Sequence, residues 1–469
     1  MKNGIVDHGG GRLPLLLKIS AALCAAVLGW RALPAQAQIA VKNQGYVPYS
    51  EAPIHYRTAE VRDPVAKLQQ RLDRGEARLM YEPGRGYLKS VLQALDIPVS
   101  SQTLLFSKTS FQYRKISPQT PRALYFNDDV YVGWVRDGKA LEIVSFDPMQ
   151  GAIFYILDEA EAARPRFERA ELDCTQCHVA PETRGVPGVL LRSVYANPSG
   201  SQASRAASFV TGHESPLRDR WGGWYVTGTH GRQTHMGNAF VRDREHPEEL
   251  DRAAGANVMD LSTRFDITPY LSGHSDIVAQ LVQAHQTQMH NLITLTNYQT
   301  RLALHAKAPA RQYEAPAEQL VRYLLFADEA PLEDRIAGST SYAAEFAARG
   351  PRDPRGRSLR DFDLRTRLFK YPCSYLIYSE AFDALPDPAR AYVYRRLLDI
   401  LSGRDRSPDF ARLTPEDRRA ILDILLATKP GLPAEWSEYR NQPISTRKTR
   451  LGRRRPGIAD NEAFHERKN

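Results

Sequence analysis

Cysteine is scarce in this chain of 469 residues. Of its four cysteines, Cys174 and Cys177 are three positions apart, whereas Cys24 and Cys373 stand alone. A structural zinc site needs a second pair of closely spaced ligands, which the sequence does not contain. Cys373 lies among aromatic and apolar residues, so we expect it to be a buried small hydrophobic side chain rather than a reactive thiol. Neither zinc nor a disulfide framework is therefore expected to stabilise this fold.

Long apolar runs are also missing. The best candidate, Ile19–Gly29, is too short to span a bilayer, and no later stretch comes close. It follows a basic leader and precedes Ala35-Gln36-Ala37, a small-x-small cleavage sequence. We therefore interpret residues 1–37 as a secretory signal peptide, whose removal also takes away Cys24. The remaining chain is expected to have no transmembrane segment.

Positive charge is in excess, but it is not spread over the chain. The net charge is +9, of which the signal segment carries +3 and residues 440–469 carry +6. The part between them is close to neutral, so the composition does not support binding of nucleic acid. We expect residues 441–469 to form a disordered basic tail. Such a tail could contact anionic lipid at a membrane surface or an acidic partner, or could be solvated without a role.

Several sequence signatures of catalysis are absent. There is no Walker loop, no Gly-x-Ser-x-Gly elbow and no His-Glu-x-x-His helix. The chain does contain Cys174-Thr175-Gln176-Cys177-His178. In a Cys-x-x-Cys-His motif, both thiols can add to the vinyl groups of one haem while the histidine reaches its iron.

This motif has two competing interpretations, a redox-active thiol pair and half of a zinc site. A thioredoxin-like pair lies between a strand and a helix of a βαβ unit, whereas residues 164–172 are charged and helix-prone. We therefore predict one covalently bound haem c, anchored by Cys174 and Cys177, with His178 as the proximal iron ligand. Covalent haem attachment takes place outside the bacterial cytoplasmic membrane. The motif and the signal peptide thus support each other and indicate the periplasm.

The hydrophobic periodicity changes along the chain and predicts an α+β fold. Apolar residues at helical spacing predict short helices at 63–79 and 86–96. Short β-branched and aromatic runs predict an antiparallel sheet, with Asp137-Gly138 as its best hairpin turn and strands at 104–116, 122–126, 130–135, 140–146 and 152–157. After the haem motif, residues 189–195 could return as a strand, and residues 220–226 are expected to form a turn into another strand. Later helices are expected at 275–306, 317–328, 342–348, 388–401 and 415–428. An antiparallel β-rich N-terminal half, residues 38–246, thus carries the haem motif, and residues 247–440 form a mainly α-helical C-terminal half.

The ligand opposite His178 decides what the iron can do. A second strong ligand makes it an electron relay, whereas an open face lets small molecules bind and react. Eight of the twelve histidines lie within residues 213–305. A glycine-rich stretch there contains His230, His235 and Met236, and we expect Met236 or His235 to be the distal ligand. The alternative is a polar hairpin whose histidines bond the backbone.

The longest predicted helix carries His285, Met289 and His290. At about 100° per residue, His285 and Met289 share an apolar face, whereas His290 points roughly 140° away from His285. These two histidines therefore cannot easily hold the same metal, and a lone histidine on an apolar face is more often a core residue than a ligand. Candidates for a second metal site or for acid–base roles are His230, His285 and His290. Candidate donors to the haem propionates are Arg184, Arg192, Arg220, Trp221 and Trp224.

The motif and the leader resemble those of secreted bacterial c-type cytochromes, and the resemblance covers few other residues. Stretches at 122–135, 221–231, 285–291 and 371–386 are similar to long monohaem proteins of bacteria, from which no activity carries over. The resemblance implies a haem c and redox partner proteins. We therefore expect a periplasmic monohaem c-type cytochrome that transfers electrons between redox partners. The alternative is a haem-dependent oxidoreductase with an open distal face or a second metal site.

Overall fold

The computed structural model describes residues 47–204, 206–243 and 245–439. The predicted signal peptide, residues 1–37, and the predicted tail, residues 441–469, lie outside the described residues. The described parts of both predicted halves belong to the same compact unit. Within these ranges, the structure contains no helix that combines the length and the apolar character needed to cross a membrane.

A seven-stranded antiparallel sheet forms the N-terminal half, which confirms the predicted α+β class. The order of its strands is β6-β5-β4-β3-β2-β1-β9. Their bounds are β1 (Thr103–Leu105), β2 (Arg122–Phe126), β3 (Val130–Trp134), β4 (Ala140–Asp147), β5 (Gly151–Asp158), β6 (Phe167–Arg169) and β9 (Trp224–Tyr225). The Asp137-Gly138 turn joins β3 to β4 as predicted, with Asp137 in the left-handed conformation (φ 55°) that this turn requires.

Three sequence predictions near the sheet were wrong in part. The strand expected at 104–116 ends at Leu105, because the backbone N–H groups of the next two residues bond to Gly223 instead. The strand expected at 189–195 is only β7 (Arg192–Val194), which pairs with β8 (Ser208–Val210) outside the main sheet. The helix-prone residues 164–172 contain strand β6, whose Phe167 is buried by pairing with β5. Here tertiary pairing overrides local propensity.

The helices follow the predicted pattern more closely. Their bounds are α1 (Pro64–Asp73), α2 (Leu88–Ala94), α3 (Glu171–His178), α4 (Ile277–His305), α5 (Arg311–Leu324), α6 (Tyr342–Ala348), α7 (Glu380–Asp383), α8 (Asp387–Leu401) and α9 (Pro415–Thr428). Helix α1 is shorter than expected because Gly75 adopts a left-handed conformation just beyond its end. Helix α5 begins before Pro316 and ends at Leu324, earlier than predicted. A short pair, β10 (Gly228–Thr229) and β11 (Ala337–Gly338), completes the named strands.

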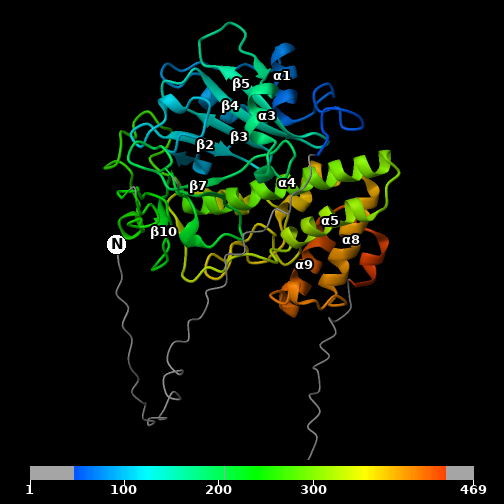
Figure 1. Cartoon of the computed structure of the whole chain (residues 1–469). Coiled ribbons are helices and arrows are strands. Elements are labelled where there is room, and N and C mark those ends of the chain that lie inside the picture. The colour runs from blue at the N-terminus through cyan, green and yellow to red at the C-terminus, as the bar shows by residue number, and fades with distance from the viewer. Residues whose placement is uncertain (1–46, 205, 244, 440–469) are drawn as a thin grey trace, which may run out of the picture. The chain divides into compact units, whose positions relative to one another are not determined.

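Helix α4 lies between the sheet and the helices α5, α8 and α9 (Figure 1). Its first turn is capped by Asp276, whose carboxylate accepts from the backbone N–H groups of Val278 (2.8 Å) and Ala279 (3.2 Å). Every residue from Ile277 to Tyr298 is buried, including its histidines, glutamines and asparagines. A helix that is buried on all sides must find partners for each polar side chain. These partners define much of the interior described below.

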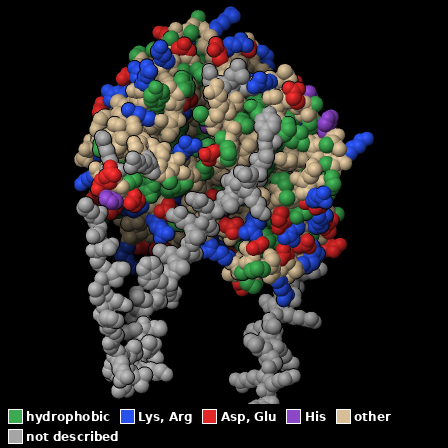
Figure 2. Space-filling model, viewed as in Figure 1, with side chains coloured by type: hydrophobic (Ala, Val, Ile, Leu, Met, Phe, Trp, Pro, Cys, Tyr) green, Lys and Arg blue, Asp and Glu red, His purple; other side chains and the backbone are tan. Residues whose placement is uncertain are grey.

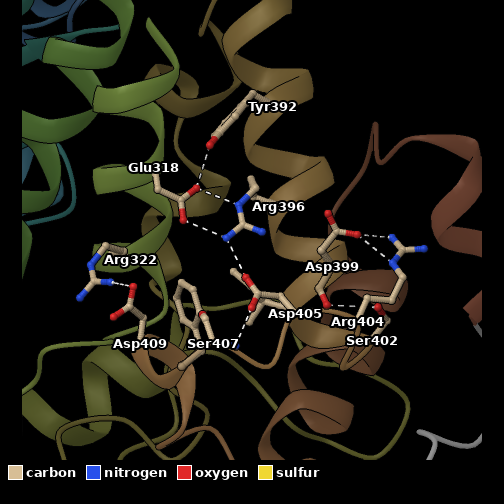
Figure 3. Close-up of polar contacts among 12 residues, drawn as sticks. Glu318, Arg322, Tyr392, Arg396, Asp399, Ser402, Arg404, Asp405, Ser407 and Asp409 are labelled. Carbon is tan, nitrogen blue, oxygen red and sulfur yellow. Dashed lines mark hydrogen bonds and ion pairs between the residues drawn. The ribbon is translucent and has the colours of Figure 1, made fainter. Parts of the chain in front are cut away.

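Basic and acidic side chains are intermixed on the face drawn in Figure 2, over the C-terminal helices as well as over the sheet. One network joins α5 to α8 and to the loop after α8 (Figure 3). Arg396 donates to both carboxylate oxygens of Glu318 (2.8 and 3.0 Å) and to Asp405 (2.8 Å), and Tyr392 also donates to Glu318 (3.0 Å). These bonds, first that to Glu318, raise the pKa of Arg396.

Replacing Glu318 by glutamine is expected to lower the free energy of unfolding by about 1–2 kcal/mol. The substitution removes a two-pronged charged contact that is only partly screened by solvent, although Asp405 still faces Arg396. Urea denaturation would measure the change. The matched control is Glu76→Gln, which breaks the Arg74–Glu76 pair (2.7 Å) on the surface, and no measurable change is expected there. Equal effects of the two substitutions would contradict the prediction.

Candidate haem site

Helix α3 carries the Cys-x-x-Cys-His motif and lies against β5 (Figure 1). It begins directly after β6, so the motif follows a strand, contrary to the sequence prediction. A thioredoxin-like site, however, uses the first residues of a helix to activate its thiol, and here Cys174 is the fourth and Cys177 the seventh of the eight residues of α3. Cys174 is partly buried, Cys177 is exposed and neither forms a disulfide.

The imidazole of His178 is held in one orientation by the loop that follows α3. Its Nδ1 donates to the carbonyl oxygen of Gly188 (2.8 Å), and the N–H of Gly188 donates to the carbonyl oxygen of His178 (3.0 Å). Nδ1 then carries the proton, which leaves the lone pair on Nε2, and Nε2 makes no hydrogen bond to a described residue. Burial lowers the pKa of His178, against the effect of the bond to Gly188. A neutral imidazole with a free Nε2 is suited to bind a metal.

Asn291 of α4 fixes this loop. Its Oδ1 accepts from the N–H of Val189 (3.0 Å) and its Nδ2 donates to the carbonyl oxygen of the same residue (2.7 Å). A Cβ atom on Gly188 would overlap the amide of Asn291, so this close approach requires glycine. The buried helix α4 thus supports the residue that orients His178. Sequence reasoning missed Asn291, because nothing in its local pattern relates it to a loop about a hundred residues away.

An incompletely buried apolar surface extends from His178 over one face of the sheet. The ring of Phe154 on β5 lies 5.0 Å from the ring of His178. Neighbouring positions on the same face, by strand register, are Leu124, Gly133, Glu142, Val144 and Ile156. The three aliphatic side chains among these are only partly buried, whereas most of the core is fully buried. Such a surface, beside the two thiols of the motif and an imidazole nitrogen without a hydrogen bond, fits the apolar faces of a haem.

A charged pair borders this surface. Arg122 of β2 reaches across Gly133 to Glu142 of β4, with 2.5 Å between its Nη2 and the carboxylate. Glu142 also accepts from Ser110 (2.5 Å) and Gln112 (2.9 Å), and the Nε of Arg122 has no partner among the described residues. Both charges affect the pKa of His178, which Arg122 lowers and Glu142 raises. Arg122 was not among the predicted propionate donors, and it is a further cation beside the motif.

The structure places the two predicted distal ligands in buried positions. Met236 is fully buried in a small apolar cluster separate from the one against which Cys174 packs, and its sulfur lies 3.7 Å from the Ser193 hydroxyl. The ring of His235 lies 4.7 Å from that of His230 and 5.4 Å from that of Trp221. Ligation by Met236 or His235 stays a prediction.

His230 accepts at Nε2 from the backbone N–H of Asn257 (3.0 Å). His230 thus bonds the backbone, as the alternative interpretation expected, but the stretch forms no hairpin, because β10 pairs with β11.

The two histidines of α4 have different neighbours, as their helical spacing predicted. His285 lies 2.9 Å from the Nδ1 of His213 and 2.8 Å from the Ser374 hydroxyl. His290 donates to the carbonyl oxygen of Asp128 (2.8 Å) and stacks on Phe146. Burial lowers the pKa of His285 to about 3 and that of His290 to about 4. Among the described residues, no group of three or more histidine, cysteine, aspartate or glutamate side chains is placed to hold a metal ion.

Three of the predicted propionate donors, and Cys373, already have partners or positions in the interior. Arg220 is buried and donates to the carbonyl oxygens of Ser215 (2.8 Å) and His213 (2.9 Å). Trp221 is buried, and the indole of Trp224 donates to the carbonyl oxygen of Arg192 (2.9 Å). Cys373 is fully buried, which raises its thiol pKa to about 12 and confirms the predicted buried hydrophobe.

Comparison of this chain with family models, with curated proteins and with solved structures finds no match. The chemistry of the site is therefore inferred from its own residues. The two thiols of the motif, an imidazole with its Nε2 unbonded and a partly open apolar surface lie together at α3 and β5. This set can hold a haem through two thioether bonds and one iron ligand.

Proposed function

We propose that the protein is a periplasmic monohaem c-type cytochrome that transfers electrons between redox partner proteins. The observation that carries this proposal is the Nδ1 bond of His178 to Gly188, which leaves Nε2 free beside the two thiols of the motif. Cys174 and Cys177 would anchor the haem, and His178 would be its proximal ligand. Met236 or His235 would be the distal ligand of the iron. The bound group would supply a one-electron iron couple.

The residues around the motif have separable roles in this proposal. Gly188 orients the imidazole, and Asn291 holds the loop in place through Val189. Burial keeps His178 uncharged at neutral pH, so that Nε2 can bind a metal without first losing a proton. Phe154 and its neighbours on the sheet would exclude water from one side of the group. The basic tail could contact an acidic redox partner or the membrane surface.

The first test of this proposal is covalent haem attachment. The full chain would be produced with its leader in a bacterium that matures c-type haem proteins. One haem per chain is expected to remain bound after denaturation, and Cys174→Ala with Cys177→Ala is expected to remove it. Cys373→Ala, which alters a thiol of the core, should retain the haem. Wild-type protein without covalent haem would overturn the proposal.

A second candidate function, a haem-dependent oxidoreductase, is favoured by one observation. Arg184, His213, Glu214 and Tyr323 gather in the interior near the loop that follows the motif. Absorption and magnetic resonance spectra of the holoprotein would separate the two functions. Low-spin iron that does not bind carbon monoxide, and that loses a ligand in Met236→Ala or His235→Ala, supports electron transfer. High-spin iron that binds carbon monoxide supports the oxidoreductase.

A further inference from the structure

Arg184 is a buried arginine whose guanidinium has no partner in the part of the chain that the structure describes. The buried arginines among the described residues are Arg184, Arg220, Arg360 and Arg418. Arg220 and Arg418 donate to backbone carbonyl groups, and Arg360 pairs with Asp128. Arg184 is only 7% exposed as a residue, its guanidinium makes no hydrogen bond or ion pair with any described residue, and its Nε is enclosed. It is the exception in this set.

Burying the charge of Arg184 without a partner is energetically unfavourable. An arginine stays protonated in proteins, although burial lowers the pKa of Arg184. A buried charge that lacks a compensating partner costs several kcal/mol, so such groups are normally paired or bound to a ligand. The planar guanidinium presents parallel N–H groups that match the two oxygens of a carboxylate or of a similar oxyanion. The expected missing partner of Arg184 is therefore an anion.

Other polar groups surround Arg184. The groups that counteract the lowering of the Arg184 pKa are Tyr323 and Glu214, both of which raise it. The Tyr323 hydroxyl lies 3.3 Å from the Glu214 carboxylate. The ring of His213 stacks on that of Tyr323 (3.9 Å), and its enclosed Nε2 also lacks a partner. Arg220 contributes a second positive charge near Glu214. Burial raises the pKa of Glu214, against the opposing effects of Arg184 and Arg220. Two enclosed nitrogen atoms without a partner among the described residues, Nε of Arg184 and Nε2 of His213, thus occur in one buried cluster.

The cluster is connected to the haem motif through the chain. Arg184 follows the short 3-10 turn Pro181–Thr183 and lies six residues after His178, in the loop that ends at Gly188. Its backbone adopts the left-handed conformation (φ 62°), which is unfavourable for a residue with a side chain. The N–H of Arg184 bonds to the carbonyl oxygen of Pro181 (3.0 Å) and stabilises this turn. The same loop therefore orients the imidazole at one end and buries a guanidinium in its middle.

We propose that Arg184 is the centre of a buried oxyanion-binding site, with His213 and Tyr323 at its side. The ligand chemistry is a carboxylate or a small inorganic oxyanion. It could come from a haem propionate, in which case the inference rests on the proposed function, or from solution, in which case it does not. Either source would supply the negative charge that Arg184 lacks.

The test compares wild-type protein with Arg184→Gln. The control is Arg85→Gln, because the guanidinium of Arg85 is already used by Glu82 and by the carbonyl oxygen of Pro269 (both 2.8 Å). Purified protein would be titrated with acetate, nitrite and inorganic phosphate by calorimetry, and the midpoint potential of the holoprotein would be measured against pH. For an anion from solution, Arg184→Gln is expected to weaken binding at least tenfold, whereas Arg85→Gln leaves it unchanged.

For a propionate, the added anions would not bind. The midpoint potential would then fall in Arg184→Gln, and its pH dependence would shift, because a positive charge next to the propionate has been removed. Arg85→Gln would keep the wild-type values. The proposal is overturned if no anion binds and both variants have the potential of the wild type. If the protein carries no haem, the proposed function has failed and calorimetry alone decides the site.

Thermal unfolding separates an anion-binding role of Arg184 from a purely structural one, because the two roles predict opposite effects of Arg184→Gln on stability. If the guanidinium only supports the fold, Arg184→Gln should unfold at a lower temperature than wild type in buffer without these anions. If it is an unpaired charge awaiting an anion, the variant should unfold at the same or a higher temperature. Arg184→Lys, which keeps the charge but loses the parallel N–H groups, should bind the anion with intermediate affinity.

Discussion

The free energy of unfolding is expected to fall by about 3–4 kcal/mol between pH 7 and pH 5 through two histidines alone. Burial lowers the pKa of His285 to about 3 and that of His290 to about 4, whereas an unfolded histidine titrates near pH 6.5. Below that pH the unfolded chain binds protons that the folded chain does not. Stability therefore rises with pH in this window and is lost on acidification, by about 1.4 kcal/mol per pH unit for each histidine.

Urea denaturation at several pH values would measure this loss, and His290→Gln isolates one contribution. Glutamine can still donate to the carbonyl oxygen of Asp128, so the variant should fold while its slope against pH becomes shallower by one histidine. His246→Gln is the control, because His246 is exposed and its bond to Asp243 raises its pKa. That substitution should not reduce the loss on acidification. Identical slopes for wild type and His290→Gln would refute the argument.

Asn291→Ala is expected to lower the free energy of unfolding by about 2–4 kcal/mol. The change leaves the buried N–H and carbonyl groups of Val189 without partners, at roughly 1–3 kcal/mol each, and opens a small cavity. It also releases the neighbouring Gly188, which orients His178. In the holoprotein we therefore expect a second effect, a change in the magnetic resonance spectrum that reports on the orientation of the proximal ligand.

Asn297→Ala, on the same helix, is the matched control for Asn291→Ala. Asn297 is buried as well, but its amide makes only long contacts. Its Nδ2 lies 3.4 Å from the carbonyl oxygen of Ala384 and 3.9 Å from the sulfur of Met149, and its Oδ1 accepts from Arg301 at 3.4 Å. The expected loss of stability is smaller, and the spectrum of the haem should not change. Equal losses for the two asparagines, with both spectra unaltered, would show that the contact with Val189 does not support the site.

These predictions share one structural element, because the side chains of α4 hold several distant segments. His290 holds the turn at Asp128, Gln286 donates to the hydroxyl of Tyr131 (2.8 Å), and Asn291 holds the loop after the motif. Polar side chains in a fully buried helix restrict packing to arrangements that satisfy them. Helix α4 thus sets the position of the sheet and of the loop that carries Gly188.

Much of the secondary structure and the centre of the site follow from local sequence. The strands β2 to β5 and the helices α4, α6, α8 and α9 lie where periodicity, turn residues and caps predicted them, because these signals act over a few neighbouring residues. The spacing of Cys174, Cys177 and His178 is likewise a local pattern, and it is the basis of the haem prediction.

Only the tertiary structure decided the surroundings of that motif. Strand β6 forms because Phe167 gains burial beside β5, although its own neighbours are charged. Asn291 meets Val189 across about a hundred residues, and Arg184 becomes buried beside Tyr323 of α5. Such contacts depend on how helices and sheet pack together, and no local propensity encodes them. The sequence by itself determined which residues can carry the chemistry, and packing determined which of them are oriented, enclosed and left without a partner.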